Sequence, residues 1–203
     1  MFVWVLEGKV SDPEEVGRQL GHWIGEFGST TPGYLGVTGG VTNDRRFLLF
    51  VRWESEEAGD AFLMRPQQQA WYEEFQKSFD GPVHFDESGD VTTYLAGGSD
   101  TAGFVQGMKV SGVDRQRIDA ADREFENIAP GIRPDLIGGL RVWTAADAFV
   151  EANYFTSEEQ AREGEREEPP PELAEGFADF MEMTKDAEYF DFTEPLLHSA
   201  PSR

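Results

Sequence analysis

The sequence FLLFVRW-ESEEAGDAFLMRP-QQQAWYEEFQKSF, from Phe47 to Phe79, decides the fold. Its opening segment is dense in large apolar side chains, which is typical of a buried β-strand. Ser55-Glu56-Glu57 then predicts a helix start, because serine caps a helix and acidic residues favour its positive end. Arg65-Pro66 interrupts that helix, and aromatic residues recur at helical spacing in its second part. The stretch predicts a strand followed by a helix in two parts.

A copy of this stretch occurs about a hundred residues later. It reads FVEANYF from Phe149 to Phe155, then TSEEQAREGERE, then ELAEGFADFMEM ending at Met183. Further matches include Val5 and Lys9 with Val105 and Lys109, at an offset of 100. Similarity at a nearly constant register predicts an internal duplication.

Each copy has the pattern of a ferredoxin-like unit. The expected elements of the first copy are a strand Phe2–Val10, a helix opened by Ser11-Asp12-Pro13, a hairpin of Tyr34–Thr42 and Phe47–Trp53, the two-part helix, and late strands Val83–Phe85 and Val91–Leu95. The order β-α-β-β-α-β is that of the split βαβ fold. We therefore expect an α+β protein made of two tandem ferredoxin-like repeats.

Residues 1–96 form the expected first repeat, 97–102 a Gly- and Ser-containing linker, and 103–203 the second repeat. The second repeat contains the insertion REGEREEPPP at 162–171, which we expect to be a solvated excursion because it joins a charge run to three prolines. A C-terminal tail follows the last expected strand, and Leu196-Leu197 can anchor it.

The strand Phe47–Trp53 is apolar on both faces, apart from Arg52. Both faces of such a strand are expected to be covered. Helices cover one face, and the sheet of the sister repeat is the simplest cover for the other. We expect the repeats to pack sheet to sheet as an intramolecular α+β barrel.

The segment RWESEEAGDAFLMRPQQQAWYEEF, from Arg52 to Phe75, resembles the dimeric α+β barrel superfamily and most closely its antibiotic biosynthesis monooxygenase-like (ABM-like) branch. The resemblance covers the whole chain, taken as two fused units. It implies a cofactor-independent monooxygenase that binds a small hydrophobic or aromatic molecule between sheet and helices. Trp53, Trp71 and Tyr72 match the pocket positions of the family, although all three could simply be core. Haem degradation is disfavoured, since the first strand has no Asn and Tyr72 stands near the position of the family's His.

The second repeat places Glu151 and Asn153 on a strand face whose equivalent positions in the first repeat are Leu49 and Val51. If that face is buried, the raised pKa of Glu151 makes it a candidate acid or base in a substrate-binding pair with Asn153. Arg141 is a candidate partner, and a purely structural Glu–Arg pair is the alternative. Because Phe155 replaces Trp53 and no tryptophan follows in the second helix of the second repeat, the first repeat is the better place to expect a site.

Composition excludes several classes of function. With 39 acidic residues against 17 basic ones the net charge is −22, which disfavours nucleic acid and anionic membranes as partners. The absence of cysteine excludes disulfides and thiolate chemistry. The histidines, His22, His84 and His198, show no metal-ligand spacing, so we expect no metal and no cofactor. No leader or membrane-spanning run is evident, so we expect a cytoplasmic protein and leave further homodimerisation open.

Three functions remain open: an ABM-like monooxygenase, a non-catalytic barrel that binds a hydrophobic ligand or scaffolds a partner, and a stress- or salt-related protein whose acidic surface is its main property. An open aromatic pocket with convergent polar groups favours the first. A filled core favours the second.

Overall fold

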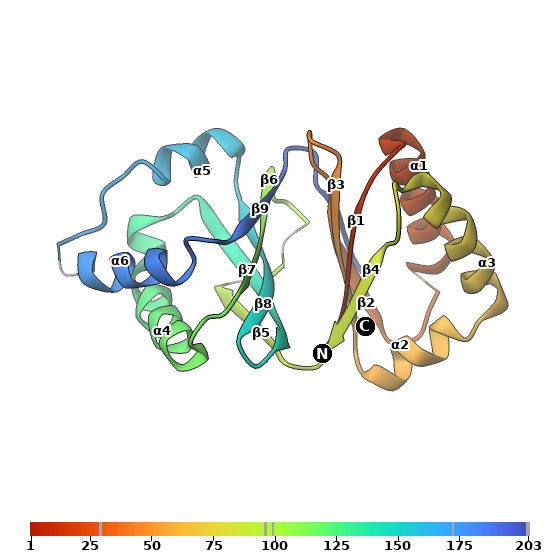
Figure 1. Cartoon of the computed structure of the whole chain (residues 1–203), viewed down its shortest axis with the longest axis horizontal. Helices are drawn as coiled ribbons and strands as arrows, with labels where there is room; N and C mark the ends of the chain where they lie inside the picture. Colours follow the sequence, from red (N-terminus) through yellow and green to blue (C-terminus); the bar gives the residue numbers. More distant parts are fainter. Residues whose placement is uncertain (29, 96, 99, 172, 202–203) are drawn as a thin grey trace. The chain divides into compact units, whose positions relative to one another are not determined.

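The computed structural model describes residues 1–28, 30–95, 97–98, 100–171 and 173–201 (Figure 1). Ser29, Ala96 at the end of the expected first repeat, Ser99 of the expected linker, Glu172, and the last two residues of the expected tail lie outside the described residues. The chain divides into two compact units. Unit 1 comprises Met1–Val91 with Glu194–Arg203, and unit 2 comprises Thr92–Thr193.

Unit 1 is a five-stranded sheet of order β10-β2-β3-β1-β4. Its elements are β1 (Phe2–Lys9), α1 (Pro13–Trp23), a π-helical turn (Ile24–Gly28), β2 (Tyr34–Val41), β3 (Arg46–Trp53), α2 (Glu56–Leu63), α3 (Pro66–Phe75), a 3₁₀ turn (Gln76–Ser78), β4 (His84–Ser88) and β10 (Leu196–Ser199). The core of the unit gathers the aromatic residues of β1, β3 and the helices. Helices α1, α2 and α3 cover one face of this sheet (Figure 1).

Unit 2 repeats the plan, with sheet order β5-β7-β8-β6-β9. Its elements are β5 (Val91–Leu95), β6 (Phe104–Ser111), α4 (Arg115–Ile132), β7 (Leu136–Ala145), β8 (Ala148–Phe155), α5 (Glu158–Gly164), α6 (Ala174–Met183) and β9 (Glu188–Phe192). All strand pairs with a recorded register are antiparallel. The expected α+β class, with two tandem ferredoxin-like halves, is confirmed.

The helix starts follow from their caps. Asp12 accepts a hydrogen bond from the backbone N–H of Glu15 at 3.1 Å, and Pro13 occupies the first turn of α1. Ser55 accepts from the N–H of Ala58 at 3.3 Å to begin α2. Pro66, which cannot continue a helix, begins α3 instead. Asp114 and Ser157 cap α4 and α5 in the same way.

The compact units do not coincide with the two sequence repeats. Strand β5, at the end of the first repeat, joins the sheet of unit 2, and β10, at the end of the chain, joins that of unit 1. In β10 Leu196 pairs with Gly39 and Leu197 with Thr38. The sequence predicted Val91–Leu95 as a strand and residues 196–199 as part of a tail, and it specified a partner strand for neither, because any free sheet edge offers the same backbone groups.

The expected offset of 100 for the first strand is wrong, and the structure gives 102. Phe2 pairs with Trp53 in β1–β3, and Phe104 pairs with Phe155 in β6–β8, so Phe104 corresponds to Phe2. The error has a simple cause. Side chains alternate with a period of two, so a two-residue slip keeps every residue on its face.

Among the described helices, none is long and apolar enough to cross a membrane.

Candidate functional site

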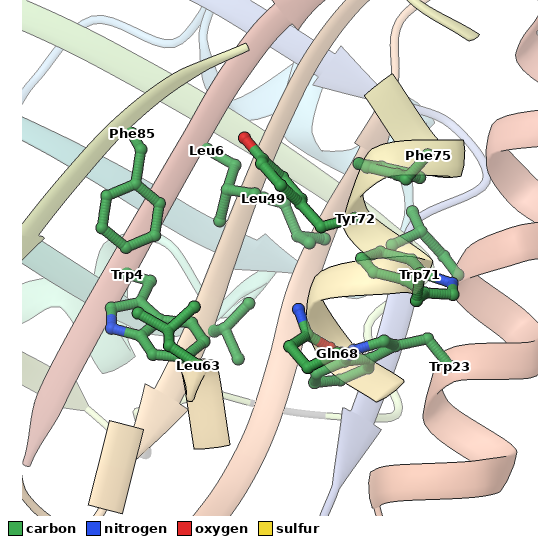
Figure 2. Close-up of a pocket in the computed structure, with 12 residues that line it drawn as sticks. Trp4, Leu6, Trp23, Leu49, Leu63, Gln68, Trp71, Tyr72, Phe75 and Phe85 are labelled. Carbon is green, nitrogen blue, oxygen red and sulfur yellow. Dashed lines mark hydrogen bonds between the residues drawn. The ribbon is translucent and has the colours of Figure 1, made fainter. Parts of the chain in front are cut away.

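Unit 1 contains a small apolar cavity of about 250 Å³ beneath its helices. Figure 2 shows aromatic side chains from α1, α3, β1 and β4 facing one another around it. The lining residues are Trp4, Leu6, Leu20, Trp23, Leu49, Val51, Leu63, Gln68, Trp71, Tyr72, Phe75 and Phe85, none of which carries a charge at neutral pH. This cavity offers packing surface rather than reactive groups.

Trp71 and Tyr72, two of the positions singled out by the family resemblance, are among the residues that line this cavity. The Trp71 ring stacks on Phe75 with centroids 4.6 Å apart. Burial raises the pKa of the Tyr72 hydroxyl. The side-chain oxygen of Gln68 accepts a hydrogen bond from the indole N–H of Trp23 at 2.7 Å. This oxygen of the one side-chain amide among the lining residues is therefore already paired.

Trp53 lies elsewhere. Its side chain is fully buried and is not among the residues that line the cavity. Its ring packs against Trp4 at 4.7 Å, Phe62 at 5.2 Å and Tyr34 at 5.8 Å. At the end of β3, beneath α2, it is enclosed by these rings and has the contacts of a core residue.

Unit 2 contains a much larger cavity, of about 910 Å³, bounded by β6, β7, β8 and helices α4, α5 and α6. Its apolar lining includes Met108, Phe125, Leu136, Phe155, Phe177 and Phe180. The insertion at 162–171 also contributes, through Arg162, Gly164, Glu165, Glu167, Glu168, Pro169 and Pro170. The insertion is therefore not merely the solvated excursion expected from its composition, because it supplies part of a cavity wall.

A buried polar cluster lies in the wall of this cavity and is made of Tyr94, Asp122, Arg141, Glu151 and Asn153. The Nε and Nη2 atoms of Arg141 donate to Oε2 of Glu151 at 2.7 and 2.6 Å, and the two side chains are only 3% and 4% exposed. Asn153 donates to the other Glu151 oxygen at 3.0 Å. Tyr94 donates its hydroxyl proton to Asn153, and Arg141 also donates to Asp122.

Burial and the neighbouring charges shift the pKa values of several groups in the cluster. Burial raises the pKa of the Asp122 carboxyl to about 6, although the neighbouring Arg141 works in the opposite direction. Burial also raises the pKa of the Tyr94 hydroxyl well above its usual range. Burial opposes the charge of Arg141, but Glu151 and Asp122 outweigh it and raise the pKa of the guanidinium. At neutral pH the cluster therefore contains a fixed cation, a neutral phenol and a carboxyl with a pKa close to physiological pH.

The sequence predicted part of this cluster. Glu151, Asn153 and the partner Arg141 come together as expected, and they do so at the larger cavity of unit 2. Sequence reasoning missed Asp122 and Tyr94. A signal for Asp122 was present, because it is an acid on the helix face that carries Ile118 and Phe125.

The histidines lie apart from both cavities. The imidazole of His22 lies 3.1 Å from Glu26 on the surface of α1, His84 is exposed in β4, and Nδ1 of His198 lies 3.1 Å from the Tyr34 hydroxyl. Within the described part of the chain, no group of three His, Asp or Glu side chains could hold a metal ion.

No family model matches the sequence. No curated protein matches it either. Solved structures do match over nearly the full length. A proposed monooxygenase from Lactobacillus acidophilus NCFM has a TM-score of 0.68 at 11% identity, covering 98% of this chain and 95% of its own.

Two further structures match to a similar extent. An anthrone oxidase-like protein has a TM-score of 0.67 at 10% identity, covering 99% of this chain and 94% of its own. A proposed monooxygenase from Fusobacterium nucleatum subsp. nucleatum ATCC 25586 has a TM-score of 0.65 at 11% identity, covering 98% and 91%. The chain therefore has the fold of these proteins. The resemblance to tandem ABM-like proteins is confirmed at the level of the fold.

Proposed function

We propose that the protein is a cofactor-independent monooxygenase that oxidises a small aromatic metabolite in the cavity of unit 2. The observation that carries this proposal is the combination of a cavity of about 910 Å³ with a buried polar cluster in its wall. Small-molecule sites typically enclose roughly 300–1,000 Å³ and pair apolar walls with a few convergent polar groups. The cavity has both properties.

The walls suit a flat ring system. Phe125 and Phe155 come from α4 and β8, while Phe177 and Phe180 come from α6, so aromatic surface is available from several sides. Asn153 lines the cavity and has a second amide N–H that would donate to a phenolic or keto oxygen, while Glu151 holds the amide in place by accepting the first. Hydrogen bonds in such apolar surroundings are stronger than in water, so this contact would determine the orientation of the substrate.

The chemistry needs only the substrate and dioxygen. An electron-rich aromatic CH₂ group that loses a proton becomes a carbanion, which can reduce dioxygen directly. The overall change is SH₂ + O₂ → S=O + H₂O, in which the substrate supplies all four electrons. The protein would contribute orientation, proton transfer and exclusion of water. The anthrone oxidase-like name belongs to a structural neighbour, and it makes anthrone the first substrate to try.

The cavity of unit 1 favours a second function. With no charged side chain in its lining, it suits hydrophobic ligand binding better than catalysis. We propose Trp71 and Tyr72 as ligand contacts there, and Trp53 as a core residue that supports them.

The test is oxygen uptake by the full chain with anthrone and with a hydroquinone, each measured against the non-enzymatic rate. Asn153→Ala should lower the rate by an order of magnitude or more, while Trp71→Leu in the other cavity should leave it nearly unchanged. Uptake that is lost in Trp71→Leu but kept in Asn153→Ala would place the reaction in unit 1. If the wild-type protein binds anthrone without increasing oxygen uptake, the non-catalytic alternative is correct.

A further inference from the structure

We propose that Asp122 is the base that removes the substrate's proton in the unit 2 cavity, and that Arg141 holds it in position. The inference rests on the proposed function, because it identifies the group that would begin that reaction. It moves the reactive carboxylate from Glu151, the candidate suggested by the sequence, to a residue on α4.

The placement of Asp122 suits a base. It lines the cavity, and its side chain is 23% exposed, so a bound ligand can reach it. Its Oδ2 atom accepts a hydrogen bond from Arg141, whereas its Oδ1 atom accepts none from the described residues. One oxygen is thus anchored and the other remains available to accept a proton.

The other members of the cluster are less suited to this role. Both oxygens of Glu151 are occupied, one by Arg141 and the other by Asn153, and its side chain is 4% exposed. Tyr94 donates to Asn153 and keeps its proton, since burial raises its pKa well above the usual value. Glu151 therefore acts as the fixed counter-ion of Arg141.

The remaining acids of the cavity are also unsuitable. Glu165 and Asp191 are bound to Arg162 through ion pairs. Glu124, Glu126, Glu167 and Glu168 are exposed to solvent at the cavity edge or in the insertion. Solvation keeps an exposed carboxylate a weak base.

The electrostatic surroundings give the Asp122 carboxyl a pKa that suits a base at neutral pH. Burial raises the pKa of its carboxyl to about 6, and Arg141 from β7 counteracts that rise. Glu151 from β8 and Asp119 on the same helix raise it further, and Tyr94 from β5 faces it as a neutral phenol. Such a carboxyl is largely ionised at neutral pH and is more basic than an ordinary aspartate.

In the proposed step the Asp122 carboxylate takes a proton from the substrate CH₂ and becomes a carboxylic acid. The carbanion transfers electrons to dioxygen, a C–O bond forms, and the resulting peroxide anion takes the proton back from Asp122. The hydroperoxide then loses water to give the ketone. Asp122 ends in its starting state, and dioxygen is the oxidant.

The test uses a reaction that needs a base but no oxygen. 5-Nitrobenzisoxazole is a small aromatic carbon acid, and removal of its ring proton breaks the N–O bond to give a coloured phenolate. The full chain should accelerate this opening, with a rate that rises through a midpoint near pH 6 as Asp122 ionises. Asp122→Asn should lower the rate about 100-fold or more, which is the usual contribution of a positioned base. Asp179→Asn removes the same charge from a residue of α6 that is paired with Arg117 and does not line the cavity, and should have little effect.

The outcomes separate the two proposals. Ring opening that depends on Asp122, without oxygen uptake from anthrone, would retain the base and overturn the monooxygenase. Oxygen uptake that survives in Asp122→Asn would retain the monooxygenase and overturn the base. The wild-type pH profile decides the question even if Asp122→Asn folds poorly, because a purely structural aspartate gives no midpoint near pH 6.

Discussion

Replacing Arg141 by methionine should destabilise unit 2 strongly. The guanidinium and its partner Glu151 are only 3% and 4% exposed, and Arg141 also stacks on the Phe149 ring at 4.3 Å. Methionine fills much of the space but leaves two buried carboxyls, those of Glu151 and Asp122, without their cation. Breaking one side of a buried ion pair typically costs about 3–5 kcal/mol. We expect about 4 kcal/mol at pH 7, and less at pH 5, where Asp122 is mostly protonated.

The double variant Arg141→Met with Glu151→Leu should recover much of that loss, because the remaining carboxyl, that of Asp122, is partly exposed and readily protonated. Replacing both members of a buried pair by apolar groups is often neutral or stabilising. The coupling energy from the two single variants and the double variant should then be about 2 kcal/mol or more. Arg18→Met, which breaks an exposed pair with Glu15, is the matched control and should leave the stability nearly unchanged.

Urea unfolding followed by circular dichroism gives these free energies. Hydrogen exchange of peptides from β7 and β8 shows whether the loss is confined to unit 2. A cost below about 1 kcal/mol for Arg141→Met would mean that the cluster is hydrated rather than buried, and would refute the reasoning.

Three further predictions follow from single contacts. Gly139→Ala would place a Cβ atom 1.8 Å from the Tyr94 ring and should cost about 1–3 kcal/mol of stability. In the control variant Gly17→Ala the new Cβ atom meets nothing within 4 Å, and stability should rise by up to about 1 kcal/mol. Thermal melting compares the two variants. The pKa of Asp122 is about 6 in the folded protein and 3.8 in the unfolded chain, so the folded protein binds a proton more tightly. Lowering the pH from 7 to 5 should therefore raise the free energy of unfolding by about 1 kcal/mol through this group. Urea unfolding at both pH values checks that gain, which Asp122→Asn should abolish. Gln68→Leu leaves a buried indole N–H unpaired and should cost about 1–3 kcal/mol in the same assay, so an unchanged stability would mean that this hydrogen bond contributes little.

Much of the fold could be predicted from local chemistry. Ser55, Ser157 and the Asp-Pro pair at Asp12 mark helix starts because their side chains satisfy free backbone N–H groups. Pro66 marks the division between α2 and α3. Val91–Leu95 was predicted as a strand, but the sheets that β5 and β10 join could not be predicted, since edge pairing depends on where the chain leads in space and not on which side chains it carries.

The site was harder to predict than the fold. Glu151 and Asn153 could be recognised because charged and amide groups rarely occupy a buried strand face without a partner. Trp53 was misleading, because a large aromatic residue at the end of a strand fits a core and a pocket equally well. Asp122 was overlooked because an acid in a helix usually faces solvent, and only its position relative to Ile118 distinguishes it.

Most residues of the cluster have structurally equivalent positions in the first repeat, where other side chains stand. At the structural offset of 102, Asp122 corresponds to Leu20, Glu151 to Leu49, Asn153 to Val51 and Arg141 to Gly39. Three of these counterparts, Leu20, Leu49 and Val51, line the apolar cavity of unit 1. The two cavities are thus built at the same place in the fold, with apolar side chains at these positions in one and an ion-pair network in the other.

A buried ion pair is a weak source of stability compared with the apolar packing at the equivalent positions. Unit 1 shows that this fold can form at those positions without any charge. The fold therefore does not require Asp122, Arg141 and Glu151 at these positions, although burying them together costs free energy. The buried charges of Arg141 and Glu151 compensate each other, and Asp122 shares the same cation, so the three form one network that faces the larger of the two cavities. This difference between equivalent positions is the strongest argument for placing the proposed reaction in unit 2.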